Sequence, residues 1–281
     1  MQRSYDSLFH FTDKLEVLVS ILLNKFKGSY CREEFKYKDQ SIAQIVPKVS
    51  FCDIPQGTLH QYRNYGDYAI GLTKSWAKRN RLNPVLYVES HSLIAQSLID
   101  AYNGTRRAVS FLGATADAIK AAWQPLEGKG VPLSLRIQDP QTAIDYHKHV
   151  EDALKAVNFN NYSLCYIKPY DADLVRRGTT IKDYRFYDER EWCYVPDFNT
   201  FIQEYNMAPS EYDLWRGTGQ AKPLLERLTL PFEYSDVSDL VVPSQHDKER
   251  LTELIDSLPD EGFIENSSKV QLKATIKVSQ G

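Results

Sequence analysis

The first segment of the chain pairs a short apolar run with a helical pattern. Residues 8–11 are apolar apart from one histidine, which predicts a strand. Four apolar residues at helical spacing then predict a helix over 13–26: Leu15, Leu18, Leu22 and Phe26. Asp13 and Glu16 resemble a capping box at the start of that helix. The chain is therefore expected to begin with a strand followed directly by a helix.

Short segments rich in β-branched and aromatic residues recur further along. They predict strands at 49–52, 68–72, 85–88, 164–168, 191–195, 230–234, 239–242 and 270–278. In the last of these, five apolar residues alternate with polar ones: Val270, Leu272, Ala274, Ile276 and Val278. Helical spacing predicts further helices near 73–80, 92–102, 106–123, 142–157 and 247–258.

This mixed order of strands and helices predicts an α+β fold in a single domain spanning 1–281, with two lobes divided near residue 130 as the alternative. Pro and Gly residues predict a loop at 125–132. The segment 197–228 has a mixed pattern and is expected to be an insertion.

Candidate chemistry is concentrated in YRFYDEREWCYVP at 184–196, which places Glu189 and Glu191 two residues apart. If this segment is a strand, both carboxylates leave the same side of the sheet, while Trp192 and Tyr194 pack on the other side. Paired carboxylates stabilise the positive charge that develops at a sugar carbon during glycosidic cleavage. The alternative is a surface strand on which residues 188–191 form a solvated charge cluster.

His10 is a second candidate, because it lies near the end of a predicted strand and just before a predicted helix. That position favours the edge of a pocket. The alternative is a core histidine whose ring is satisfied by its neighbours.

Composition narrows the function classes. With 281 residues and 42% hydrophobic residues, the chain can bury a full core, and its net charge of −3 means that any nucleic-acid-binding groove must be local. The four cysteines show no metal-binding spacing, and His147 and His149 are separated by two residues, which does not suit a metal pair on a helix. We expect no metal, no membrane span and no signal peptide, and hence a cytoplasmic protein.

Six motifs together resemble known families: LFHFT at 8–12, VSFCDIP at 49–55, YGDYAIGLTKSW at 65–76, NPVLYV at 83–88, YIKPY at 166–170 and YRFYDEREWCYVP at 184–196. Over roughly 5–245 the chain resembles the AbiGi-type abortive-infection family of bacterial phage-defence loci, a family that carries an antitoxin label. The pattern of an early histidine strand and a late glutamate strand also resembles the ADP-ribosyltransferase fold, with mixed sheets and flanking helices, and in particular the DarT-like enzymes that modify nucleic acids.

The resemblance implies roles for individual residues. Glu191 would stabilise the charge on the ribose of NAD, and Glu189 would orient or deprotonate the acceptor. The remaining candidates would bind NAD, which is a substrate here. His10, Phe11 and Thr12 would hold its ribose side, Tyr62 or Tyr68 would stack on nicotinamide, and Lys74 and Arg190 would contact the pyrophosphate. Packing is the alternative role for each tyrosine, and a solvated surface position is the alternative for Lys74 and Arg190.

The expected function is therefore that of a mono-ADP-ribosyltransferase toxin in a toxin–antitoxin system for phage defence. Its acceptor is expected to be single-stranded RNA or DNA, with a protein acceptor or plain NAD hydrolysis as alternatives. A neutralising antitoxin protein would restrain it, and the predicted strand at 270–278 offers an exposed edge for such a partner unless it simply completes the sheet. The competing hypothesis is a non-enzymatic antitoxin or regulator with a degenerate transferase fold.

Overall fold

The structure is a computed structural model that describes residues 6–123, 148, 152, 155–156, 159–176, 178–197, 207–218, 225, 227–258 and 266–279. The predicted loop at 125–132 lies outside the described residues, as do the position near 130 and most of the predicted helix at 142–157.

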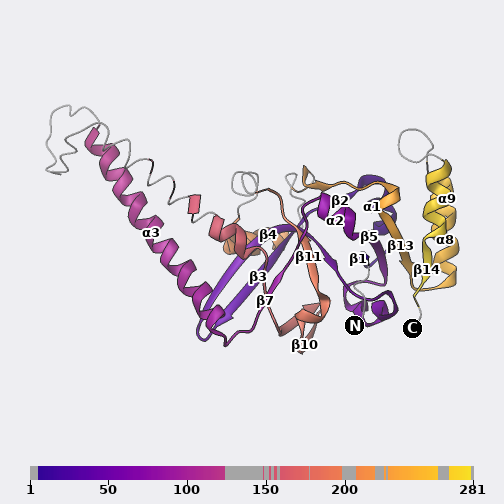
Figure 1. The fold of residues 1–281 in the computed structure, drawn as a ribbon, viewed down its shortest axis with the longest axis horizontal. Helices are drawn as coiled ribbons and strands as arrows, with labels where there is room; N and C mark the ends of the chain where they lie inside the picture. Colours follow the sequence, from indigo (N-terminus) through magenta and orange to yellow (C-terminus); the bar gives the residue numbers. More distant parts are fainter. Residues whose placement is uncertain are drawn as a thin grey trace.

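A mixed eight-stranded sheet forms the centre of the molecule (Figure 1). Its strands are β1 (Ser7–Thr12), β3 (Ser29–Tyr37), β4 (Gln40–Cys52), β5 (Tyr68–Thr73), β6 (Asn83–Pro84), β11 (Glu191–Tyr194), β13 (Val237–Val242) and β14 (Ile276–Val278). Their order is β14-β13-β5-β1-β4-β11-β6, with β3 paired to β4. All pairs are antiparallel except β13 with β14, which makes the sheet mixed. The predicted α+β class is confirmed.

Three smaller strand pairs complete the β-structure. They join β2 (Phe26–Lys27) to β12 (Thr229–Leu230), β7 (Leu86–Val88) to β8 (Ile167–Pro169), and β9 (Ala172–Arg176) to β10 (Thr179–Tyr184). The described α-helices are α1 (Leu15–Asn24), α2 (Lys74–Arg79), α3 (Leu93–Trp123), α6 (Pro209–Thr218), α8 (Gln245–Ser257) and α9 (Asn266–Ala274). Short 3-10 helices are η1 (Gln56–Tyr65), η2 (Phe186–Glu189) and η4 (Tyr234–Asp236). Helix α3 projects away from the sheet, on the side of the molecule opposite α8 and α9 (Figure 1).

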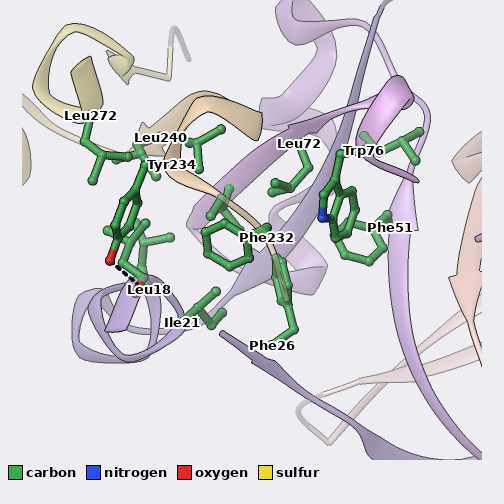
Figure 2. Close-up of a cluster of buried hydrophobic side chains, with 14 of the residues drawn as sticks. Leu18, Ile21, Phe26, Phe51, Leu72, Trp76, Phe232, Tyr234, Leu240 and Leu272 are labelled. Carbon is green, nitrogen blue, oxygen red and sulfur yellow. Dashed lines mark hydrogen bonds between the residues drawn. The ribbon is translucent and has the colours of Figure 1, made fainter. Parts of the chain in front are cut away.

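The main core lies on one face of the sheet, between it and helices α1, α2, α8 and α9. Aromatic rings fill its centre, where Phe26 contacts Phe51 edge-on and Trp76 packs against both (Figure 2). The indole of Trp76 is fully buried and donates a hydrogen bond to the Pro231 carbonyl at 2.9 Å. This core packs against one face of β1, β4 and β5, the strands that position the candidate site.

Strand β4 changes its partner part-way along its length. Residues from Gln40 to Lys48 pair with β3, whereas residues from Val49 to Cys52 pair with β11. Strand β1 pairs with β4 at a single position, Phe9 opposite Cys52, although it pairs with β5 along its whole length. Strands β1 and β4 therefore separate on the N-terminal side of Cys52, toward Ser50, and the sheet splits between them.

Several local predictions are wrong. The strand predicted at 230–234 is limited to β12, because Pro231 has no N–H for a ladder and η4 begins at Tyr234. The strand predicted at 164–168 begins only at Ile167, and the helices predicted at 92–102 and 106–123 are one continuous helix. Helix α1 has Lys14 at its N-cap, without a side-chain cap, so the predicted capping box is absent. Apart from these corrections, the segment 197–228, which is expected to be an insertion, includes helix α6.

The C-terminal segment is the largest correction. Residues predicted as a strand from 270 form the last turns of α9, and only Ile276–Val278 form a strand, β14, at the edge of the sheet. Leu272 is fully buried against the core, whereas Val270 is 65% exposed. Lys269 is also buried, and it donates to the Leu258 carbonyl at 2.5 Å, which ties α9 to the end of α8. Packing against α8 thus favours a helix over the alternating pattern.

We predict that the two apolar positions of α9 respond very differently to truncation. Leu272→Ala removes a fully buried side chain and should lower the free energy of unfolding by about 2–5 kcal/mol. Val270→Ala, on the exposed face of the helix, should change it by no more than about 0.5 kcal/mol. Urea unfolding of both variants measures this. Equal losses would contradict the helix, because a strand would bury both side chains on one face.

Candidate functional site

A pocket of about 550 Å³ opens where β1 and β4 separate. Its walls come from β1, the start of α1, β3, β4 and the turn that precedes β11. Segments far apart in the sequence contribute to it, since His10 and the carboxylates Glu189 and Glu191 all line it. The sequence-predicted histidine and carboxylate pair are therefore brought together in one cavity.

Five charged side chains form a continuous chain of ion pairs beside this pocket, which we call the charged network. Glu33 on β3 pairs with Lys48 on β4 at 2.5 Å, and Lys48 pairs with Glu191 on β11 at 2.9 Å. Lys168 on β8 pairs with Glu191 at 2.6 Å and with Glu189 at 3.1 Å. Charges of opposite sign alternate along the whole chain, so each ion has a partner of opposite sign.

Burial distinguishes this network from a surface charge cluster. Glu189 is 2% exposed, Glu191 3% and Lys48 4%. Asp188 and Arg190 are exposed, as the alternative interpretation expects, but the two glutamates are not. The interpretation of residues 188–191 as a solvated cluster is therefore wrong for Glu189 and Glu191.

The two carboxylates converge for a different reason from the one predicted. Glu189 is the last residue of η2, Arg190 has a left-handed backbone with φ of 45°, and Glu191 begins β11. The pair does not lie on one strand, so the predicted strand geometry is wrong, yet both carboxylates contact Lys168. Trp192 and Tyr194 pack on the opposite face of β11 against the main core, as predicted.

The ion pairs keep the buried groups charged. Burial alone would raise the pKa of the Glu191 carboxyl, but Lys168 and Lys48 outweigh it and hold that pKa below its usual range. Burial would likewise lower the pKa of both lysines. The neighbouring carboxylates reverse this effect and hold the pKa of Lys48 and of Lys168 well above its usual value. Glu191 is therefore an ionised carboxylate with both oxygens directed at ammonium groups.

Tyrosines fix the positions of the carboxylates. The Tyr65 hydroxyl donates to Glu189, and the backbone N–H of Glu191 donates to the Tyr87 hydroxyl oxygen at 2.7 Å. Burial raises the pKa of both phenols, so each stays protonated near neutral pH. Tyr65, at the end of η1, lines the pocket and links it to Glu189.

His10 marks the point where β1 and β4 separate. Its Nδ1 donates to the Ser50 carbonyl of β4 at 2.8 Å, where the ladder between the two strands has already ended. The ring packs against Phe26 and Phe51, with centroids 5.2 and 5.5 Å away. Burial lowers its pKa, although the bond to Ser50 acts in the opposite direction. The ring is thus neutral near pH 7, with Nε2 as an acceptor.

The other predicted NAD-binding residues divide into two groups. Phe11 and Thr12 line the pocket beside His10. The remaining four do not line it. The Tyr62 hydroxyl donates to the Asp188 carbonyl at 3.0 Å, and the Tyr68 hydroxyl donates to Asp247 at 3.0 Å. Lys74 pairs with Asp53 at 2.7 Å. The Arg190 side chain is exposed.

Sequence reasoning missed Glu33, Lys48, Lys168 and Tyr65. Two of them stood in motifs that were recognised but given no role: Tyr65 opens YGDYAIGLTKSW, and Lys168 is the lysine of YIKPY. Two exposed lysines, Lys14 and Lys27, also line the pocket and form a basic rim.

No cluster of three or more potential metal-ligating side chains occurs among the described residues, and His147 and His149 lie outside them. Within the same part of the chain, no helix is long and apolar enough to cross a membrane.

Residues 24–243 match the family model described as "Putative abortive phage resistance protein AbiGi, antitoxin". The chain belongs to the AbiGi family. It is similar to the abortive phage resistance protein AbiGi of Lactococcus lactis subsp. cremoris, with 25% identity over 228 residues that cover 75% of this chain and 76% of the relative. No solved structure matches. The AbiGi match spans all five positions of the charged network but begins after His10.

We predict that Lys48→Met destabilises this AbiGi protein by about 3–5 kcal/mol, because it leaves the buried carboxylate of Glu191 and the half-buried carboxylate of Glu33 without their shared cation. The double variant Lys48→Met/Glu33→Gln should recover part of this loss. Lys36→Met is the matched control, since Lys36 pairs with Glu34 on the surface at 3.5 Å and should cost no more than about 1 kcal/mol. Equal losses for Lys48→Met and Lys36→Met in urea unfolding would contradict this prediction.

The loss should also depend on pH. The pKa of Glu191 is lowered in the folded protein, so the stability from its ion pairs is present above the unfolded value of about 4.3 and is lost as pH falls through the folded value. The difference in free energy of unfolding between wild type and Lys48→Met should therefore be constant near neutral pH and narrow below about pH 4. A difference that stays constant throughout an acid titration would show that Glu191 is not the group involved.

Proposed function

We propose that this AbiGi-family protein is a mono-ADP-ribosyltransferase that transfers ADP-ribose from NAD to a single-stranded nucleic acid during phage defence. The observation that carries the proposal is the meeting of His10 in one pocket with two buried carboxylates, Glu189 and the ionised Glu191. Buried ionised groups are costly and concentrate at functional sites, which favours chemistry over a purely structural role.

The pocket has groups suited to each part of NAD. The neutral His10 ring offers Nε2 to a ribose hydroxyl, and Thr12 lies beside it. The rings of Phe11 and Tyr65 line the same cavity, and either can face the cationic nicotinamide. Lys14 and Lys27 on the rim suit the pyrophosphate better than Lys74, which is paired with Asp53, or Arg190, whose side chain points elsewhere. A volume of about 550 Å³ is of the size that holds a small-molecule ligand.

The reaction breaks the bond between nicotinamide and ribose. Nicotinamide leaves with the bonding electrons, positive charge develops on the ribose carbon, and the acceptor forms a new bond there as it loses a proton. Glu191 is the group proposed to stabilise that charge, and Glu189 is proposed to accept the proton. The charged network contains three glutamates and two lysines, so with all five groups ionised it favours a cationic centre.

The proposed acceptor is an unpaired nucleobase, since a base stacked in a duplex hides its reactive edge. The chain carries a net charge of −3, so the binding of a strand must rely on local contacts rather than on overall attraction. We also propose that a neutralising protein restrains the enzyme in the uninfected cell.

We predict that Glu191→Gln abolishes transfer, with a loss of about a hundredfold or more, because glutamine keeps the size of the side chain but not its charge. Asp188→Asn is the matched control, since it removes an exposed carboxylate from the same turn. The measurement is the transfer of label from NAD to total RNA, DNA and protein. Because Glu191→Gln also removes the partner of two lysines, His10→Ala, which leaves the charged network intact, provides a second inactive variant.

Two results would reject the enzyme: no labelling by the wild type, or full activity in Glu191→Gln. Label on protein alone would replace the proposed acceptor. Falling NAD without any labelled macromolecule would indicate hydrolysis.

A non-enzymatic antitoxin is the second candidate, favoured by the word "antitoxin" in the family description and by the neutralisation of Glu191 between two lysines. Expression of the chain alone separates the two candidates. Growth arrest that is relieved by Glu191→Gln supports the enzyme. Harmless expression that suppresses the toxicity of a neighbouring gene supports the antitoxin.

A further inference from the structure

A second cavity of about 490 Å³ lies directly behind the charged network. It shares four wall residues with the first pocket: Cys31, Glu33, Tyr65 and Lys168. Three of these four belong to the network or donate to it. The two cavities therefore meet at Glu33, Tyr65 and Lys168, with one cavity on the side of His10 and the other on the side of β8, β9 and η2.

We propose that this second cavity, lined by β3, β8, β9 and Phe186, is the acceptor subsite and holds one unpaired nucleobase of a single strand. The inference rests on the proposed transferase function. In such a transfer, the leaving group and the attacking group occupy opposite sides of the ribose carbon when the reaction proceeds in line. Two cavities that meet at the Tyr65 and Lys168 side chains, both of which contact Glu189, suit this requirement.

The position of Glu189 agrees with this division. Its two oxygens contact the Tyr65 hydroxyl and the Lys168 ammonium, and both of these side chains line both cavities. Glu189 and Glu191 themselves line only the first pocket, which agrees with the proposed action of Glu191 on the ribose. A proton lost by an acceptor in the second cavity can pass to Glu189 through the Tyr65 hydroxyl, which takes up that proton as it gives its own to Glu189.

The lining of the second cavity favours a neutral, polar and planar group. Its walls carry both signs of charge, with Arg32, Lys36 and Lys168 opposed by Glu33, Glu34 and Asp173. Several of these are already paired, since Arg32 binds Asp213 at 2.8 Å and Asp173 binds Lys182. A balanced set of donors and acceptors suits the edge of a nucleobase, which carries both, better than a phosphate. Pro169, Leu174 and Phe186 add apolar walls for the ring.

The test compares one variant in each cavity. Ala172 is exposed and lines only the second cavity, whereas Val17 is 44% exposed and lines only the first. Ala172→Trp should weaken the binding of single-stranded oligonucleotides by about tenfold or more at low salt and leave NAD binding unchanged. Val17→Trp should do the reverse. Fluorescence anisotropy with mixed-sequence RNA and DNA oligonucleotides measures the first property, and calorimetric titration with NAD measures the second.

The inference is overturned if Ala172→Trp binds oligonucleotides like the wild type, if it loses NAD binding as well, or if the wild type binds no single strand. Ser90→Phe, in another wall segment of the same cavity, repeats the test should Ala172→Trp prove unstable in a thermal melt. Failure of the proposed function looks different: the wild type would then not bind or consume NAD, while the oligonucleotide comparison would still test the second cavity.

Discussion

The alternating ion pairs of the charged network are the constraint on which the site depends. A buried carboxylate or ammonium costs several kcal/mol unless it is paired and hydrogen-bonded. Lys48 meets this requirement only if β3 brings Glu33 and β11 brings Glu191 to the same ammonium group. Lys168 likewise pairs with both Glu189 and Glu191 only if η2 ends at Glu189 and β11 begins at Glu191. One set of charges thus joins the hairpin of β3 and β4 to β8 and to the turn from η2 into β11.

The partner change of β4 makes this arrangement possible. Val49 and Phe51 point into the main core, while Lys48, Ser50 and Cys52 alternate with them along the pocket side. Since β1 pairs with β4 only at Cys52, the backbone of Ser50 needs another donor, and His10 supplies it. The same separation of strands that opens the pocket therefore fixes the histidine at its edge. Beneath these strands, Phe26, Phe51 and Trp76 pack against one another in the main core (Figure 2).

Local patterns predicted much of this fold but little of the network. Periodicity predicted the strands β1, β5 and β13 and the helices α1 and α8. The sequence around His10, Glu189 and Glu191 identified these residues as candidates. The sequence around Lys48, Lys168 and Glu33 gives no such indication, because their role arises from ion pairs between strands. The helix α9 was mistaken for a strand because Val270 and Leu272 alternate, whereas burial against α8 selects only Leu272. An alternating two-residue pattern also cannot predict the left-handed backbone of a residue such as Arg190.

The network also bears on the choice between a catalytic and a binding role. Buried ion pairs can often be replaced by apolar residues without loss of stability, so stability alone does not explain a network of five charges. A surface that recognises a partner protein would expose its charges, yet Glu189, Glu191 and Lys48 are almost fully buried. They line the first pocket instead, with a protonated Tyr65 and a neutral His10 in the same walls. Ions held in this way can act on a molecule that enters the pocket, and this favours chemistry at the split in the sheet over recognition at its surface.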